Sequence, residues 1–294
     1  MKAPPLDFLT IGFLMMVLAP FSFASTIRDD IGAQLYRDEA ALYPMVGSVV
    51  GSGLSGSGVL ISDRWVLTAG HVADSKQGGT FRVGGVDYVI DRFMRHPDHT
   101  GLSTNFDMGL LYLSSQVVGI EAATMLRLPS ATGLLGKEAT WVGNGVTGTG
   151  LDDSRGANEM RAFTNVIDGY TPNYSLPGPS FFADFDNPSG TSNSLGFQGS
   201  AASPSRLEGN VTPGDSGGGV FINEGGKNYL VGINSYTGGF AFGLNSKYGS
   251  LSGAADLGVF HDWIFSTTGI NAIPEPSVVG LLCLGTLLAL RRRR

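Results

Sequence analysis

Residues 211–219 read VTPGDSGGG, in which a serine is followed by three consecutive glycines. Its serine, Ser216, stands among glycines, which offer no side chain for packing and cost conformational entropy on folding. A backbone without neighbouring side chains is suited to a nucleophilic serine, because a substrate carbonyl must be able to approach the main-chain N–H groups beside it. A serine nucleophile needs a neighbouring base and a third group that orients the base, so the rest of the sequence can be searched for both.

Four histidines are available as the base, and one aspartate is well placed to orient it. His71 ends the apolar run WVLTAGH, where a strand can hold a side chain rigidly. His96 and His99 lie in the polar turn RHPDHT, a setting typical of solvated histidines, and His261 lies near the C-terminus. Asp107, in NFDMGLLYL, stands directly before an apolar strand and can accept the imidazole N–H.

Composition and patterning favour a β protein. Glycine contributes 44 of 294 residues and charged residues only 15%, a profile typical of short strands joined by tight turns. GVLISDRWVLT predicts a hairpin turning at 62–64, and FRVGGVDYVIDRF predicts another turning at Gly84 and Gly85. MGLLYL, ATWVGNGV and YLVGINSY predict further strands, residues 150–206 predict long loops, and DLGVFHDWIFSTT predicts one short closing helix.

Three segments, WVLTAGH, NFDMGLLYL and GDSGGG, resemble in this order the signature segments of trypsin-like (chymotrypsin-fold) serine peptidases. The resemblance extends over about residues 50–266. It implies an all-β fold of two six-stranded antiparallel β-barrels with a short C-terminal helix, within a peptidase domain of residues 25–270. No cofactor is implied, and the substrates are proteins or peptides.

The family's site residues carry over by position. Ser216 would attack the scissile carbonyl, His71 would act as base and then acid, and Asp107 would orient the imidazole. The N–H groups of Gly214 and Ser216 would form the oxyanion hole. Asp215 corresponds to the aspartate that pairs with a new amino terminus on activation.

The amino terminus that would pair with Asp215 is left open by the sequence. Ile31-Gly32 resembles such a terminus, yet it follows Asp29 and Asp30 rather than the usual basic residue. Either processing before Ile31 or a different partner for Asp215 is therefore compatible with the sequence.

The substrate pocket is inferred from the same resemblance. Asn210 falls at the base of the pocket, while Ser235, Tyr236 and Thr237 match its wall. Because no carboxylate stands at position 210, a preference for Lys or Arg is not supported. Thr237 replaces what is often glycine, which favours small or medium apolar side chains.

Both ends of the chain are predicted to be targeting segments. Residues 1–24 have the character of a secretory signal cleaved after Ala24, with a retained anchor as the alternative. Residues 271–294 contain Pro-Glu-Pro, a short apolar stretch and four arginines, and resemble the PEP-CTERM sorting signal, with a plain membrane anchor as the alternative. The implied partners are signal peptidase and an exosortase, and the implied location is the periplasm, cell surface or matrix of a Gram-negative bacterium, with transient anchoring in the inner membrane.

Charge and cysteine content exclude several functions. Between residues 25 and 270 the chain has 14 basic and 23 acidic residues, so no nucleic-acid partner is predicted. The one cysteine, Cys283, lies in the tail, which leaves the body without disulfides, a catalytic thiol or a Cys-ligated zinc site. Asp184 and Asp186 suggest a metal site less well than a turn-capping role, and no metal is predicted.

Two functional classes remain. The first is an exported serine endopeptidase that forms an acyl-enzyme. The alternative is a non-catalytic surface or matrix protein that keeps the fold for binding, with residues 164–194 as recognition loops.

Overall fold

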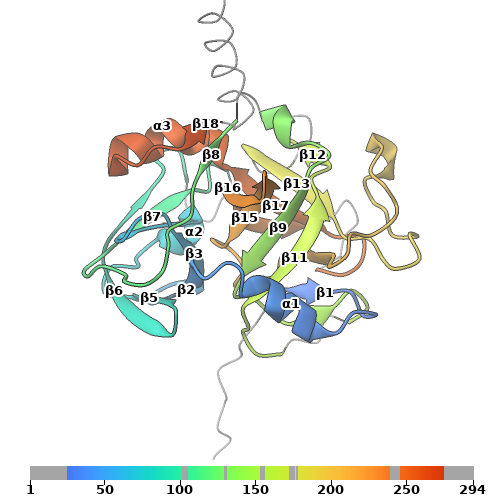
Figure 1. Cartoon of the computed structure of the whole chain (residues 1–294), viewed down its shortest axis with the longest axis horizontal. Coiled ribbons are helices and arrows are strands. Elements are labelled where there is room, and N and C mark those ends of the chain that lie inside the picture. Colours follow the sequence, from blue (N-terminus) through green and yellow to red (C-terminus); the bar gives the residue numbers. More distant parts are fainter. Residues whose placement is uncertain are drawn as a thin grey trace, which may run out of the picture.

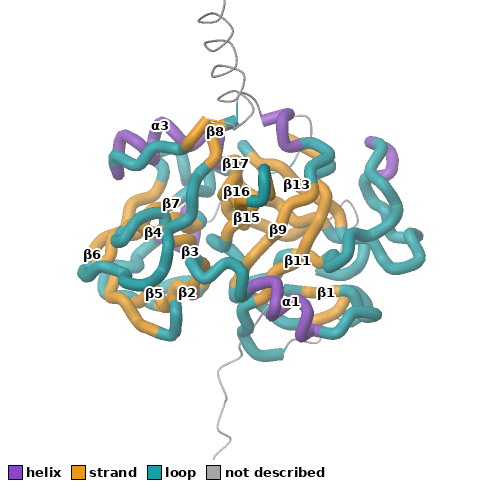
Figure 2. Tube along the Cα trace, in the orientation of Figure 1, coloured by secondary structure: helices purple, strands orange, loops and turns teal. Residues whose placement is uncertain are grey.

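The computed structural model describes residues 25–100, 105–128, 131–152, 156–171, 176, 178–238 and 246–274. Strands dominate this part of the chain and form two lobes, with a few short helices around them (Figures 1 and 2). The predicted signal segment and all but the first four residues of the predicted tail lie outside the described residues. Within the described residues, no helix combines the length and apolar character needed to span a membrane.

The first lobe is a closed barrel of six antiparallel strands in the order β2-β3-β4-β7-β6-β5. Its strands are β2 (Val46–Val50), β3 (Gly56–Leu60), β4 (Trp65–Thr68), β5 (Thr80–Val83), β6 (Val86–Arg95) and β7 (Gly109–Leu113). Both predicted hairpins are present, with β3 pairing with β4 and β5 with β6. The barrel and the all-β class are thus confirmed.

The second lobe is a seven-stranded antiparallel sheet in the order β11-β9-β15-β16-β17-β13-β12. Its strands are β9 (Glu138–Gly143), β11 (Arg161–Val166), β12 (Gly169–Tyr170), β13 (Ser180–Asp184), β15 (Gly219–Glu224), β16 (Lys227–Gly238) and β17 (Leu251–Asp256). The described strands curve as a half-barrel, where the sequence analysis expected a second closed barrel of six strands. A closed barrel beside this half-barrel gives the chymotrypsin-like fold.

Short strands attach both ends of the described chain to this body. In one three-stranded sheet, β1 (Thr26–Ile27) lies between β10 (Gly148–Thr149) and β14 (Gly209–Asn210). In a separate two-stranded sheet, β18 (Ile273–Pro274) pairs in parallel with β8 (Leu126–Arg127). The N-terminal segment is therefore part of the second lobe, directly next to the strand that leads to the Ser216 loop.

In the described part of the chain, the strands are accompanied by the α-helices α1 (Ala33–Ala40), α2 (Gly70–Ala73) and α3 (Leu257–Thr268), with 3-10 turns at Ala131–Leu134 and Gly196–Gln198. The closing helix α3 is confirmed, whereas α1 was not predicted. Only Tyr36 and Ala40 of α1 are buried, and two apolar contacts on a polar segment make too weak a helical pattern to recognise.

A continuous cluster of buried apolar side chains joins the two lobes. It runs from Val59 and Leu111 in the barrel to Val142 and Leu230 in the second sheet. Contact between these faces fixes the lobes against each other without any disulfide, and the site described next lies where they meet.

Candidate active site

Strand pairing brings His71 and Asp107 together. Strand β4 ends at Thr68, which is paired with Gly109 at the start of β7. His71 follows β4 within α2, and Asp107 directly precedes β7, so both side chains emerge at the same end of the barrel. His71 Nδ1 lies 2.8 Å from Asp107 Oδ2, and the backbone N–H of His71 donates to Asp107 Oδ1 at 2.9 Å.

Asp107 is buried and held by a third donor from the other lobe. Ser235, in β16, donates its hydroxyl to Asp107 Oδ2 at 2.5 Å. Burial raises the pKa of Asp107, but the hydrogen bonds from His71, the adjacent imidazole and the Ser235 hydroxyl outweigh burial and bring the pKa below its usual value. Asp107 is consequently a carboxylate at neutral pH. The sequence placed Ser235 in the pocket wall and missed this second contact.

Ser216 faces the same cavity as His71. Both residues line a cavity of about 250 Å³ between the lobes. The loop that carries Ser216 is held by the first barrel, because Ser57 donates its backbone N–H to the Ser216 carbonyl at 2.8 Å and its hydroxyl to the Gly214 carbonyl at 2.8 Å.

Two positions next to Ser216 require glycine, each for a different physical reason. Gly214 has φ +97°, a conformation that L side chains rarely adopt, and it aligns with the expected oxyanion donor. A Cβ on Gly217 would lie 2.1 Å from both the Ser57 carbonyl oxygen and Thr68 Oγ1. Gly217 thus allows the Ser216 loop to contact the barrel backbone closely.

The expected pocket residues divide into two sets. Ser235, Tyr236 and Thr237 line the cavity beside His71 and Ser216. Asn210 is fully buried and is not among the residues that line it. It lies behind the wall, where its amide donates to Thr237 Oγ1 at 2.8 Å and its carbonyl accepts from Ser252 Oγ at 2.7 Å.

Asp215 contacts Ser25 rather than Ile31. The Ser25 hydroxyl donates to Asp215 Oδ2 at 2.9 Å, and the same oxygen accepts from the backbone and hydroxyl of Thr212. The second oxygen, Oδ1, faces Gly145 and has no hydrogen-bond partner of ordinary geometry among the described residues. Complete burial raises the pKa of Asp215 to about 6 despite these donors.

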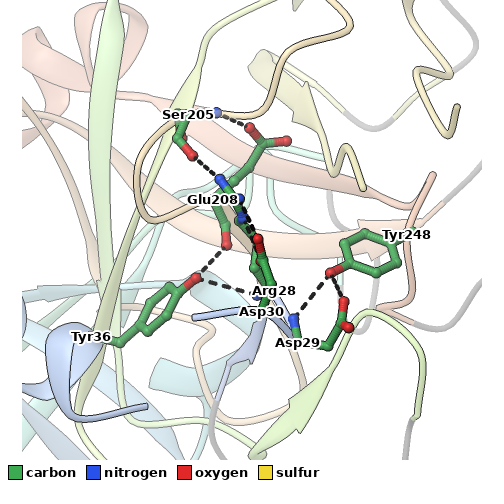
Figure 3. Close-up of polar contacts among 7 residues, drawn as sticks. All are labelled: Arg28, Asp29, Asp30, Tyr36, Ser205, Glu208 and Tyr248. Carbon is green, nitrogen blue, oxygen red and sulfur yellow. Dashed lines mark hydrogen bonds and ion pairs between the residues drawn. The ribbon is translucent and has the colours of Figure 1, made fainter. Parts of the chain in front are cut away.

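Residues 28–30, which follow β1, tie this N-terminal segment to the second lobe (Figure 3). Arg28 donates to the Ser205 carbonyl at 2.9 Å, and its backbone N–H donates to the Tyr36 hydroxyl at 3.2 Å. The Tyr36 hydroxyl in turn donates to the Glu208 carbonyl at 3.1 Å. Ile31 comes after these contacts and is partly buried near α1, so the structure does not bring it to Asp215.

The two histidines of the polar turn are not solvated, contrary to the sequence prediction. The side chain of His99 has no exposed surface and its Nδ1 lies 3.7 Å from Asp107 Oδ1. His96 is 13% exposed and stacks on Phe106, with ring centroids 5.6 Å apart. A polar sequence around a turn cannot reveal burial that comes from contacts with distant segments.

Asp184 and Asp186 belong to a buried acidic region. Asp184 Oδ2 accepts from the Leu195 backbone at 2.8 Å, which fits the loop-capping role. Burial, followed by the charge of Asp184, raises the pKa of Asp186 to about 7. Burial likewise raises the pKa of Glu208 to about 8. Within the part of the chain that the structure describes, no group of three or more His, Cys, Asp or Glu side chains is arranged to hold a metal ion.

Comparisons with known proteins agree with this geometry. Residues 35–174, which include His71 and Asp107 but end before Ser216, match the family model described as Trypsin. Over 90 residues the chain is 33% identical to "Trypsin 5G1" of Aedes aegypti, covering 28% of this chain and 34% of that protein. The match thus spans about a third of the curated relative's length. Together these matches support a trypsin-like serine peptidase.

Proposed function

We propose that this chain is a serine-type endopeptidase that hydrolyses peptide bonds through His71, Asp107 and Ser216. The observation that carries the proposal is the contact of His71 with the buried Asp107, 2.8 Å between Nδ1 and Oδ2, beside the cavity that His71 and Ser216 both line. An isolated buried carboxylate would be costly, and here it is directed at one imidazole. That arrangement is the one needed to hold a histidine in the tautomer that accepts a serine proton.

The proposed reaction has two halves. In the first, Ser216 Oγ attacks the scissile carbonyl, His71 Nε2 takes the hydroxyl proton, and the same proton passes to the leaving amine as the acyl-enzyme forms. In the second, water gives a proton to His71 and attacks the ester, and the proton returns to Ser216 when the acid departs. Asp107 stays ionised throughout and stabilises the imidazolium that forms in each half.

The N–H groups of Gly214 and Ser216 are proposed to bind the oxygen of the tetrahedral intermediate. One such donor typically contributes about 3 kcal/mol to transition-state stabilisation. The positive φ of Gly214 and the Ser57 contacts to the loop support this role, because both fix the direction of the peptide groups before substrate arrives.

The cavity supports uncharged side chains of small or medium size as the preferred residue before the cleaved bond. Thr237 lines the cavity, and its hydroxyl is bound by the Asn210 amide behind it. No carboxylate stands among the residues that line this cavity within the described chain, so a buried Lys or Arg would lack a counter-charge.

We infer that the mature chain begins at Ser25. Signal peptidase acting after Ala24 would leave Ser25 as the first residue, and the Ser25 hydroxyl is already bound to Asp215. Processing before Ile31 would instead remove Ser25 and strand β1, together with the Arg28 contacts. Asp215 would then pair with the N-terminal segment without a separate activation cleavage.

Export and processing of the tail complete the proposal. Residues 1–24 are proposed as a cleaved signal and residues 271–294 as a PEP-CTERM segment recognised by an exosortase, which would place the enzyme at the envelope or in the matrix of a Gram-negative bacterium. Both parts depend on the sequence patterns described above.

The test uses the full chain, produced in a Gram-negative host and recovered after export. We expect hydrolysis of casein, covalent labelling by a fluorophosphonate, and loss of both in Ser216→Ala. Sequencing of the N-terminus should return Ser25 first. A folded protein that neither cleaves nor takes up the probe would contradict the peptidase and favour the non-catalytic binding protein.

A further inference from the structure

The position of His99 behind Asp107 points to a role that the triad does not include. The His99 side chain has no exposed surface, although its sequence neighbours are polar. Its ring lies against Gly70, where a Cβ would come within 3.0 Å of His99 Cγ and Cδ2 and 3.2 Å of Asp107 Oδ1. Gly70 directly precedes His71, so the His99 ring and Asp107 Oδ1 both lie close to the backbone that leads into His71.

The two ring nitrogens of His99 have different surroundings. Nδ1 lies 3.2 Å from the carbonyl oxygen of Asn105, which can only accept, so Nδ1 carries a proton. Nε2 is buried and has no partner among the described residues. The N–H of Nδ1 is therefore directed at the Asn105 carbonyl.

The Asn105 carbonyl belongs to a strained turn that sets the direction of Asp107. Phe106, between the two, has φ +49°, a left-handed backbone conformation that is unfavourable in a non-glycine residue. Such a backbone conformation is kept only where contacts with the rest of the protein hold it. The Phe106 N–H donates to the Gly178 carbonyl at 3.0 Å and His99 holds the preceding carbonyl, so the turn is fixed on both sides.

We propose that His99 is a positioning residue for the carboxylate that orients His71. Its imidazole donates to the Asn105 carbonyl and lies next to Asp107 Oδ1, so that the carboxylate keeps the orientation in which both oxygens bind His71. His99 does not touch the substrate or exchange a proton in the reaction. The proposal rests on the peptidase activity proposed above, since the orientation of His71 matters for that reaction.

Two substitutions separate the hydrogen bond from simple filling of space. His99→Leu keeps an apolar side chain but removes the donor, whereas His99→Asn restores an N–H near the position of Nδ1. Both should lower thermal stability because the site is buried. Only His99→Leu should lower kcat, by about tenfold, with KM within about twofold, since one lost orienting hydrogen bond acts on the reaction and not on substrate binding.

The matched control is His261→Leu in the full chain. His261 is a buried histidine of α3 whose Nε2 accepts from the Ala272 backbone at 2.9 Å, and it does not line the cavity. This variant should lose stability while kcat stays at the wild-type value. The comparison shows whether a lower kcat in His99→Leu reflects loss of a buried histidine in general.

A second readout does not depend on activity. The proton between His71 Nδ1 and Asp107 should give a resolved low-field signal in proton NMR of the full chain, retained in His99→Asn and weakened or lost in His99→Leu. Equal kcat and an equal signal in the two His99 variants would overturn the positioning role. If the wild type neither cleaves nor takes up the probe, the peptidase proposal fails, and the NMR comparison alone still decides the role of His99.

Discussion

The Ser25 hydroxyl is expected to stabilise the buried Asp215 carboxylate, and Ser25→Ala tests this directly. The carboxyl accepts three hydrogen bonds on Oδ2, one from Ser25 and two from Thr212. A hydrogen bond to a charged group contributes about 1.5–3 kcal/mol, so loss of the Ser25 donor should cost about 2 kcal/mol when Asp215 is ionised. For a domain of this size, that corresponds to a decrease in Tm of about 4–8 °C.

The pKa of Asp215 gives this loss a definite pH dependence. Burial raises the folded-state pKa to about 6 from 3.8, so the folded protein holds its proton more tightly than the unfolded chain. Stability from this group is therefore fully present below about pH 4 and is lost as the pH rises through about 6. The Ser25 donor offsets part of that loss, because it stabilises the charged form.

The assay is thermal unfolding of the wild type and Ser25→Ala at pH 8 and at pH 4.5, on full-length protein in which sequencing shows residue 25 still joined to Ala24, so that no α-ammonium group lies beside Asp215. At pH 4.5 the carboxyl is protonated and the bond is neutral, so the decrease in Tm should fall to about half its value at pH 8. Ser266→Ala, which removes an exposed hydroxyl of α3, serves as the control and should stay within about 0.5 kcal/mol of the wild type. An equal decrease at both pH values, or none, would refute the assignment of the hydroxyl to the carboxylate.

Three further outcomes are expected. Ser235→Ala removes the 2.5 Å hydrogen bond to Asp107 and should lower kcat about tenfold with little change in KM, measured with a chromogenic peptide. Thr237→Gly removes the side chain that lines the cavity, and peptide-library cleavage should shift toward larger apolar residues before the cleaved bond. Asp186→Asn should raise the free energy of unfolding at pH 8 but not at pH 4, as measured by urea titrations at the two pH values. The folded-state pKa of Asp186 is about 7, so the folded protein loses stability relative to the unfolded chain as the pH rises from about 4 through 7, and the asparagine removes this loss.

Local patterns predicted most of the fold and the central side chains of the site. The hairpins of the first barrel follow from alternating apolar residues and from turn residues, which act over a few positions. His71, Asp107 and Ser216 each stand in a distinctive segment, and strand pairing then brings the first two together. Helix α1 was not predicted because only two of its side chains are buried, and their burial depends on contact with the sheet rather than on a local pattern.

Contacts between distant segments could not be read from the sequence. Ser25 and Asp215 are 190 positions apart, and nothing in the sequence around Ser25 signals a carboxylate partner. His99 looked solvated because its neighbours are polar, whereas its burial comes from Gly70 and Asp107. Asn210 aligned with the base of the pocket, but its direction is set by Thr237 and Ser252, which lie 27 and 42 positions away.

The Ser216 loop explains how a body without disulfides can keep an active site rigid. The first barrel holds the loop through Ser57, which donates to the carbonyls of Gly214 and Ser216. Strand β16 holds it through Asn234, whose carbonyl accepts from the Gly217 N–H at 2.7 Å and whose N–H donates to the Gly218 carbonyl at 2.8 Å. The N-terminal segment holds Asp215 from a third direction. These restraints come from the first barrel, from β16 and from the N-terminal segment, so the loop cannot keep its position if the two lobes separate. The geometry of the site should therefore be lost together with the contact between the lobes.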